Sequence, residues 1–213
     1  MLCMGEISPQ LADNEAWVDQ TFEKCDDILH RQVYLGQGRQ EGLLVYVEVA
    51  VSNLMLEEHV IGLSDVQPLK SYAEGKAALL AGNGLLFLDG DTNCYKISSK
   101  GYPGLGVKKA ENEKVIRGSQ EAFTESEKIN VALIRKRLRD SRMKVEEQTV
   151  GVRSHTMTAL VYMEDLIYQG LLTTMKQQLQ RYELDGILDS GMLEQLSEKH
   201  WLSPFPQFQT TER

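Results

Sequence analysis

Cysteine is scarce in this 213-residue sequence, and the three cysteines lie far apart at Cys3, Cys25 and Cys94. Their number is odd and none forms a CxxC pair, which argues against a disulfide framework and against a structural zinc site. The four histidines are scattered as well, without an HxxxH or HxxEH spacing. We therefore expect no metal site, and reduced thiols of the kind found in intracellular proteins.

Long hydrophobic runs and an excess of basic residues are also absent. No apolar stretch approaches the ~20 residues that a membrane-spanning helix needs, and the N-terminus lacks the basic and apolar regions of a signal peptide. The formal net charge is −8, whereas general nucleic-acid binders attract phosphate with a basic excess. We expect a soluble chain that does not bind nucleic acid.

The motifs of common enzymes are missing too. The sequence contains neither a GxSxG nor a GxxxxGK[ST] pattern, and the glycine-rich segment 36–42 leads into a strand, as a hairpin turn would. Segment 89–93 begins like a calcium loop, but Cys94 and Lys100 occupy the positions that require glycine and glutamate. We expect no catalytic residues and no cofactor.

Helical and strand patterns are both present, so the sequence predicts a mixed α/β fold. Apolar periodicity of 3.6 predicts helices, and short apolar runs between turn residues predict strands. The helices are expected at 13–31, 54–63, 66–81, 124–139, 165–182 and 190–196, and the strands at 43–51, 85–88, 94–97, 144–152 and 157–163. Segment 89–93 is predicted to be the turn of a hairpin.

Residues 100–114 carry three glycines, a proline and an unpatterned charged run, which is typical of a hinge. We therefore predict two small mixed α/β subdomains, at 1–100 and 115–200, joined by a linker at 101–114. Residues 201–213 contain two prolines and no periodicity, so an extended C-terminal tail is expected. Trypsin should cut the linker before either subdomain.

The helix at 124–139 has the strongest local signals. Thr124 and Glu127 have the spacing of a capping box, and the following run 135–144 has six basic residues among its ten. Basic residues near a helix C-terminus complement the helix dipole, so this run could be a solvated helix end. It could equally be a docking surface for an acidic partner, a neighbouring subunit or an anionic membrane.

Several motifs resemble the A subunits of bacterial spore-germination receptors. They begin with Arg117-Gly118 and the Glu121-x-Phe123-x-Glu125 step, followed by Asn130 and Ala132-Leu133-Ile134-Arg135-x-Arg137. The resemblance continues through Asp185 to Leu188 with Ser190-Gly191, through Pro204-Phe205-Pro206-Gln207, and through Thr211-Glu212-Arg213. The last proline motif is similar to nutrient receptors, whereas Tyr102-Pro103-Gly104 is similar to the related stage V accessory protein. Both branches stay open.

The resemblance implies a cytosolic domain on the core-facing side of the spore inner membrane. A multi-pass membrane domain would follow it past Arg213, and B and C subunits would complete a germinant-responsive ion-release complex. The interaction residues carried over from the matching motifs and the basic run are Arg117, Gly118, Glu121, Asn130, Arg135, Arg137, Arg139, Glu212 and Arg213. The alternative is a sensor that binds a small molecule between the two subdomains, since ligand sites favour such clefts.

Overall fold

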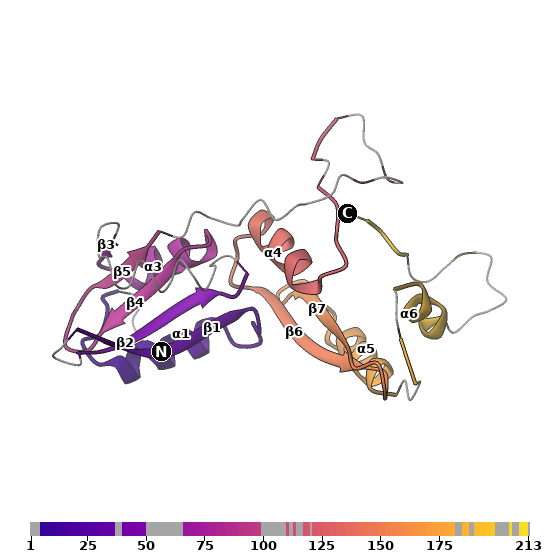
Figure 1. Cartoon of the computed structure of the whole chain (residues 1–213), viewed down its shortest axis with the longest axis horizontal. Helices are drawn as coiled ribbons and strands as arrows, with labels where there is room; N and C mark the ends of the chain where they lie inside the picture. Colours follow the sequence, from indigo (N-terminus) through magenta and orange to yellow (C-terminus); the bar gives the residue numbers. More distant parts are fainter. Residues whose placement is uncertain are drawn as a thin grey trace.

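The computed structural model of the chain contains two sheets that lie in different parts of the molecule (Figure 1). It describes residues 5–36, 40–49, 66–98, 110, 113, 117–119, 121–181, 185–187, 190–198, 205 and 209–212. We call the part built on the first sheet the N-terminal unit and the part built on the second the C-terminal unit.

The N-terminal unit is a five-stranded antiparallel sheet with the strand order β1-β2-β4-β5-β3. Two helices lie side by side on it, because Trp17 of the first stacks on Tyr72 of the second with ring centroids 4.6 Å apart. The strands are β1 (Ile28–Leu35), β2 (Gln40–Val47), β3 (Val66–Leu69), β4 (Gly84–Leu88) and β5 (Cys94–Ile97), and the helices are α1 (Leu11–Thr21) and α3 (Tyr72–Leu80).

The apolar residues of β2 form the centre of the core of this unit. Leu43, Leu44 and Val45 are all buried, as expected for a central strand. At Gly42 an added Cβ would lie 3.0 Å from the carbonyl oxygen of Phe87 in β4. The predicted strands at 85–88 and 94–97 are confirmed as β4 and β5, and the predicted turn at 89–93 joins them. The strand predicted at 43–51 is present as β2, but it starts earlier and ends at Val47.

The C-terminal unit is a two-stranded antiparallel ribbon with helices on both faces. Val131 of α4 packs with Met143 and Val145 on one face. Lys176 of α5 bonds to Glu146 on the other face. The elements are α4 (Glu127–Arg137), β6 (Met143–Val150), β7 (Thr156–Met163), α5 (Gln169–Arg181) and α6 (Ser190–Ser197), which confirms the elements predicted after residue 124 within a few residues of their bounds.

Two predicted helices of the N-terminal unit are wrong in extent. The helix predicted at 13–31 ends at Thr21, because residues from Ile28 onward pair with β2 as β1. The helix predicted at 66–81 loses its first turn to β3, which pairs with β5. Pro68 has no amide hydrogen, and the outermost strand of the sheet tolerates this. The helix predicted at 54–63 lies outside the described residues.

The predicted capping box is also wrong. Helix α4 begins at Glu127 with Ser126 at the N-cap, and no side chain caps it. Thr124 instead bonds to Asn130: its amide donates to Asn130 Oδ1 at 2.7 Å, and Asn130 Nδ2 donates to its carbonyl at 2.8 Å. The mixed α/β class is confirmed. The linker at 101–114 and the tail at 201–213 lie largely outside the described residues, so the domain bounds remain a prediction.

Candidate functional site

The two units meet where the turn between α1 and β1 runs beside β6. The amide of Asp26 donates to the carbonyl of Val145, and the amide of Val145 donates to the carbonyl of Lys24, both at 2.9 Å. Cys25 and Val145 thereby form a parallel bridge across 120 positions of sequence. This backbone contact attaches the N-terminal unit directly to the ribbon of the C-terminal unit.

A buried ion pair lies next to this bridge. Arg135 of α4 donates from Nε to Asp27 Oδ2 at 2.9 Å and from Nη2 to Asp27 Oδ1 at 2.7 Å. The exposed fractions of the two side chains are 0% and 6%. Nη1 of Arg135 donates to the carbonyls of Asp140 at 3.2 Å and Met143 at 3.1 Å, so all three guanidinium nitrogens are bonded.

The hydrogen bonds around Arg135 explain why this buried side chain stays charged. Burial acts to lower the pKa of Arg135, but the bonds to Asp27 outweigh it and the pKa is raised. Burial raises the pKa of the Cys25 thiol beside it, and that thiol bonds to the Met143 carbonyl at 3.5 Å. Arg135 is therefore a charged structural group that fixes α4, β6 and the α1–β1 turn together.

Further polar contacts surround the pair toward solvent. Lys128 of α4 forms an ion pair with Glu48, which follows β2. The amide of Glu147 in β6 donates to the Asp26 carboxylate at 2.7 Å. We call the set of Asp26, Asp27, Glu48, Lys128, Arg135 and the Cys25–Val145 bridge the junction. The bonded groups come from both units. A shift of one unit must therefore either break these bonds or move the other unit with it.

The prediction that Arg135 belongs to an exposed basic surface is wrong. The exposed members of the run are mostly paired: Glu121 binds Lys136 at 2.8 Å and Arg137 at 3.5 Å. The bond from Lys136 is the main reason that the pKa of Glu121 is lowered. Arg139 is exposed and, among the described residues, donates only to a backbone carbonyl, that of Lys136 at 3.4 Å.

Arg142 is paired as well. It bonds to Asp140, which lowers the pKa of that carboxyl to about 2, and also to Asp165 at 2.6 Å. Lys144, the last residue of the run, is also buried and forms an ion pair with Glu164 at 3.4 Å. The ten-residue run thus has a buried basic residue at each end and a largely neutralised surface between them. The sequence shows that the basic residues lie near a helix C-terminus, but it does not show which acidic residues pair with them.

The remaining candidate residues lie around the start of α4. Arg117 is exposed, and Gly118 has a φ of +130°, a conformation that side chains disfavour. The carbonyl of Glu212 accepts from the amide of Phe123 at 2.7 Å, so the segment 209–212 runs beside the loop before α4. Arg213 lies outside the described residues. Arg137 donates to Ser119, the neighbour of Gly118, at 3.1 Å. Gly118, Glu212 and Asn130 therefore lie in the same region as Glu121 and Arg137.

Asp27 was missed by sequence reasoning. It is one acidic residue in a region predicted to be an amphipathic helix, and its partner lies 108 positions away. No local pattern distinguishes it from the adjacent Asp26. Only a prediction of which elements pack together would have found the pair.

The residues weighed as metal ligands make other contacts in the part of the chain that the structure describes. No group of three or more His, Cys, Asp or Glu side chains is placed to hold a metal ion there. Asp91, from the segment that begins like a calcium loop, accepts bonds from Tyr95 at 2.6 Å and from Asn93 at 2.9 Å. The bond from Tyr95 is the main cause of its lowered pKa. Its carboxylate thus holds the β4–β5 turn.

A second polar cluster holds α5 on the ribbon. Glu146 of β6 accepts bonds from Tyr162 of β7 and from Lys176 of α5. Burial acts to raise the pKa of the Glu146 carboxyl, but these two bonds outweigh it and the pKa is lowered. Glu146 therefore contributes stability in its ionised form.

This cluster predicts a pH dependence. A carboxyl whose native pKa is depressed stabilises the fold above its unfolded pKa of ~4.3, and that contribution is lost as the pH falls through the native pKa. Glu146→Gln should cost about 1 kcal/mol at pH 7, and this cost should shrink as the pH falls below the unfolded pKa and through the native one. Urea unfolding of both proteins at several pH values measures this. A cost that stays constant with pH would contradict the ionic role.

Among the helices of the described residues, none is long and apolar enough to cross a membrane. The comparisons with known proteins concern the whole chain. Residues 54–213 match the family model described as the Bacillus/Clostridium GerA spore germination protein. The chain is also similar to a solved structure, the N-terminal domain of the A subunit of the Bacillus megaterium spore germinant receptor GerK3. That likeness has a TM-score of 0.73 at 20% identity and covers 99% of this chain and 87% of that one.

Two curated relatives from Bacillus subtilis match nearly the entire chain. The uncharacterized membrane protein YfkQ is 30% identical over 229 residues, covering 97% of this chain and 44% of that protein. Spore germination protein KA is 27% identical over 231 residues, covering 97% of this chain and 42% of that protein. The chain thus spans less than half the length of these relatives. Because the family model covers well over half of the sequence, the protein belongs to the GerA family of Bacillus and Clostridium spore germination proteins.

Proposed function

We propose that this chain is the N-terminal cytosolic domain of a spore-germination receptor A subunit. Its role is assembly or signal coupling within a membrane complex that releases ions in response to germinants. The observation that carries the coupling role is the junction, where Asp27 and Arg135 are buried and every guanidinium nitrogen is bonded. Family membership and the likeness in fold to another A-subunit domain support the assignment.

The proposed coupling role depends on the bonds that Arg135 makes to both units. Arg135 bonds at once to the N-terminal unit through Asp27 and to its own unit through the carbonyls of Asp140 and Met143. If the N-terminal unit moves, the movement of Asp27 is passed to α4 and β6 through these direct bonds. Coupling of this kind needs contacts with two discrete arrangements, and a buried ion pair is either formed or broken.

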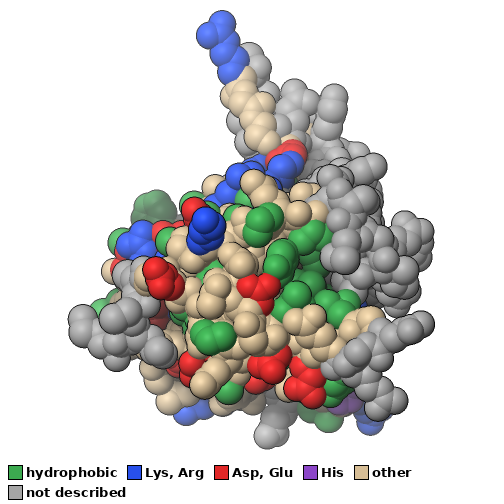
Figure 2. All heavy atoms as spheres, turned by 90° about the vertical axis from the view of Figure 1, so that its left-hand side faces the viewer, with side chains coloured by type: hydrophobic (Ala, Val, Ile, Leu, Met, Phe, Trp, Pro, Cys, Tyr) green, Lys and Arg blue, Asp and Glu red, His purple; other side chains and the backbone are tan. Residues whose placement is uncertain are grey.

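The proposed location and partners of the domain follow from its resemblance to the family. The domain faces the spore core at the inner membrane, and its partners are its own membrane domain, other A subunits, and B and C subunits. Figure 2 looks onto the end of the molecule that carries the N-terminal unit, where acidic and hydrophobic side chains are interspersed and Lys and Arg side chains gather mainly toward the top. Acidic side chains of this kind do not suit an anionic leaflet.

The alternative of a small molecule between the two units has less support. Across the junction, Arg135 bonds to Asp27 and Lys128 bonds to Glu48. A ligand there would have to replace these bonds at a cost. The motifs that divide the nutrient-receptor and accessory branches, 102–104 and 204–207, lie outside the described residues except for Phe205, so both branches remain open.

The exposed part of the basic run offers a test of assembly. Arg137→Glu combined with Arg139→Glu should leave the melting temperature of the isolated chain within a few degrees, because exposed charges contribute about 0–1 kcal/mol each. In spores, the same change in the full-length protein should slow germination and lower the amount of receptor in the membrane fraction. Germination is followed by ion release and receptor amount by immunoblot.

The matched control is Lys70→Glu combined with Arg181→Glu, which makes the same change in net charge at exposed positions elsewhere. It should germinate like the wild type. Slow germination with normal receptor levels would indicate coupling and not assembly. Equal behaviour of the two double variants would refute an interaction surface at Arg137 and Arg139.

A further inference from the structure

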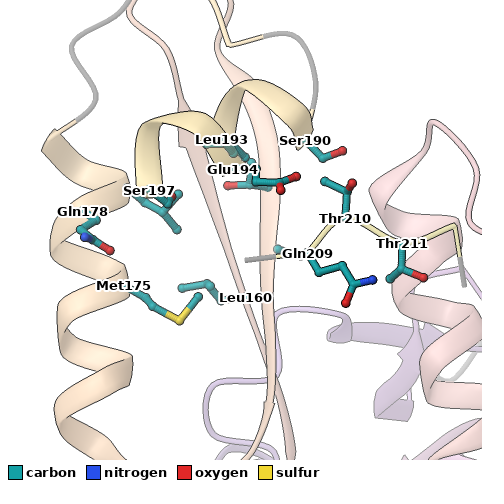
Figure 3. Close-up of a pocket in the computed structure, with 13 residues that line it drawn as sticks. Leu160, Met175, Gln178, Ser190, Leu193, Glu194, Ser197, Gln209, Thr210 and Thr211 are labelled. Atoms are coloured by element: carbon teal, nitrogen blue, oxygen red, sulfur yellow. The ribbon is translucent and has the colours of Figure 1, made fainter. Parts of the chain in front are cut away.

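A cavity of about 360 Å³ lies on the C-terminal unit, on the face of the ribbon opposite α4. Figure 3 shows its construction: α5 lies on one side, α6 above, β7 behind and the segment 209–211 on the other side. Its size falls within the range of small-molecule sites, ~300–1,000 Å³. The cavity is separate from the junction, so a ligand in it would bind independently of the proposed coupling role.

The inner walls of the cavity are mainly apolar. They are formed by Leu160 of β7, Met175 and Leu179 of α5, and Leu193 of α6. Helix α6 has no fully buried residue, and its Leu196 is 37% exposed. A short helix with this much apolar surface normally buries its stripe against a neighbour. Here the space between α6 and α5 remains open to an apolar group.

One charged side chain lies among the described residues that line the cavity, and it is Glu194 of α6. It is partly buried, and within the described part of the chain its carboxylate has no ion pair. The other polar lining groups are uncharged hydroxyls and amides, contributed by Thr158, Gln178, Ser190, Ser197, Gln209, Thr210 and Thr211. A carboxylate without a counter-charge at the edge of an otherwise uncharged site attracts a cation by its charge.

A buried polar atom without a partner lies on the same face of the ribbon. Gln148 pairs with Thr158 across β6 and β7, and Thr158 donates to its carbonyl at 2.9 Å. The side-chain nitrogen of Gln148 is buried and, in the described structure, makes no hydrogen bond. Buried donors are nearly always satisfied, so this one is an exception. Gln148 does not line the cavity, and its donor would need an acceptor, so it does not contribute to the ligand chemistry of the cavity.

We propose that this cavity is a binding site for a small primary amine that carries an apolar chain. The ammonium group lies against Glu194, and the chain lies along Leu160, Met175 and Leu193. The hydroxyl and amide groups of the rim supply the remaining bonds of the ammonium. A net charge of −8 on the protein further favours a cationic ligand over an anionic one.

The test compares three probes with the same apolar chain: hexylamine, 1-hexanol and hexanoate. Each is titrated at pH 7 into the ¹⁵N-labelled 213-residue chain and followed by amide chemical shifts. Hexylamine should shift the amides of β7, α5 and α6 and bind more tightly than hexanol, with hexanoate weakest. Glu194→Gln should weaken hexylamine about tenfold or more, as expected for the loss of a charged hydrogen bond, and leave hexanol unchanged.

Glu198→Gln is the matched control, since it removes the same charge from the next turn of the chain without touching the cavity. It should bind hexylamine like the wild type. Unchanged binding of hexanol by Glu194→Gln shows that the cavity is intact in that variant. Binding of hexanoate as tight as that of hexylamine, an equal response of the two Glu variants, or no shift at the cavity with any probe would overturn the proposal.

Discussion

Arg135→Met is expected to lower the free energy of unfolding by about 3–5 kcal/mol. The substitution leaves the Asp27 carboxylate, whose side chain is 6% exposed, without its counter-charge. It also removes the bonds to the carbonyls of Asp140 and Met143. Urea unfolding followed by circular dichroism measures the loss. This change should be far more damaging than substitution of an exposed basic residue of the run.

Arg139→Met is the control, because Arg139 is exposed and lies two residues past the end of the same helix. Its cost should stay within about 0.5 kcal/mol. The double variant Asp27→Leu with Arg135→Met should recover most of the lost stability, since apolar pairs of similar volume often replace buried ion pairs without loss. If Arg135→Met were as mild as Arg139→Met, the buried pair would have no role in holding the units together.

The double variant also separates folding from coupling. It restores an apolar contact at the junction but removes the charged bonds through which Arg135 joins the two units. If the full-length receptor with this double substitution is stable yet germinates slowly, the ion pair has a role in signal coupling. Normal germination would assign the pair to stability alone.

Phe87→Ala should lower the free energy of unfolding by a similar amount, about 3–5 kcal/mol. Phe87 is 1% exposed in β4 and meets the ring of Trp17 edge-on, with centroids 6.2 Å apart. Truncation leaves a cavity between α1 and the sheet that the surrounding side chains cannot fill. Trp17 fluorescence reports the loss directly. Tyr34→Ala is the control, since that ring lies in β1 and is 63% exposed.

The same variant tests whether the units unfold together. Phe87 belongs to the N-terminal unit, yet the amide of Val145 in β6 is bonded to the carbonyl of Lys24. If the junction couples the units, hydrogen exchange at β6 should accelerate along with that of β2 and β4. Protection of β6 that stays at the wild-type level would show that the C-terminal unit is independent of the sheet.

The elements that sequence alone predicted share one property: their signals are local. Residues 43–47 of β2 are all apolar, and the turn at 89–93 is rich in Asp, Gly and Asn. The β6–β7 hairpin has a mainly apolar strand, β7, after a short connection at 151–155. Periodicity and turn chemistry act over a few residues, so a single sequence carries them.

The elements that sequence reasoning misassigned depend on distant partners. Residues 28–31 have helical spacing, but β2 offers them a full antiparallel register, and pairing overrides a short periodic pattern. Thr124 had the right spacing for a cap, yet Asn130 bonds to it from inside the helix. The cavity beside Glu194 is likewise assembled from four separate segments.

The sequence by itself determined the mixed α/β class, the principal strands and the motifs that place the chain in its family. Only the tertiary structure decided which charges are exposed. Arg135 lies among basic residues that look alike in the sequence, and its guanidinium is fully buried because the α1–β1 turn brings Asp27 to it from 108 positions away. An isolated charge cannot be buried without such a partner. Its environment therefore depends on how the two units pack, which no local pattern records.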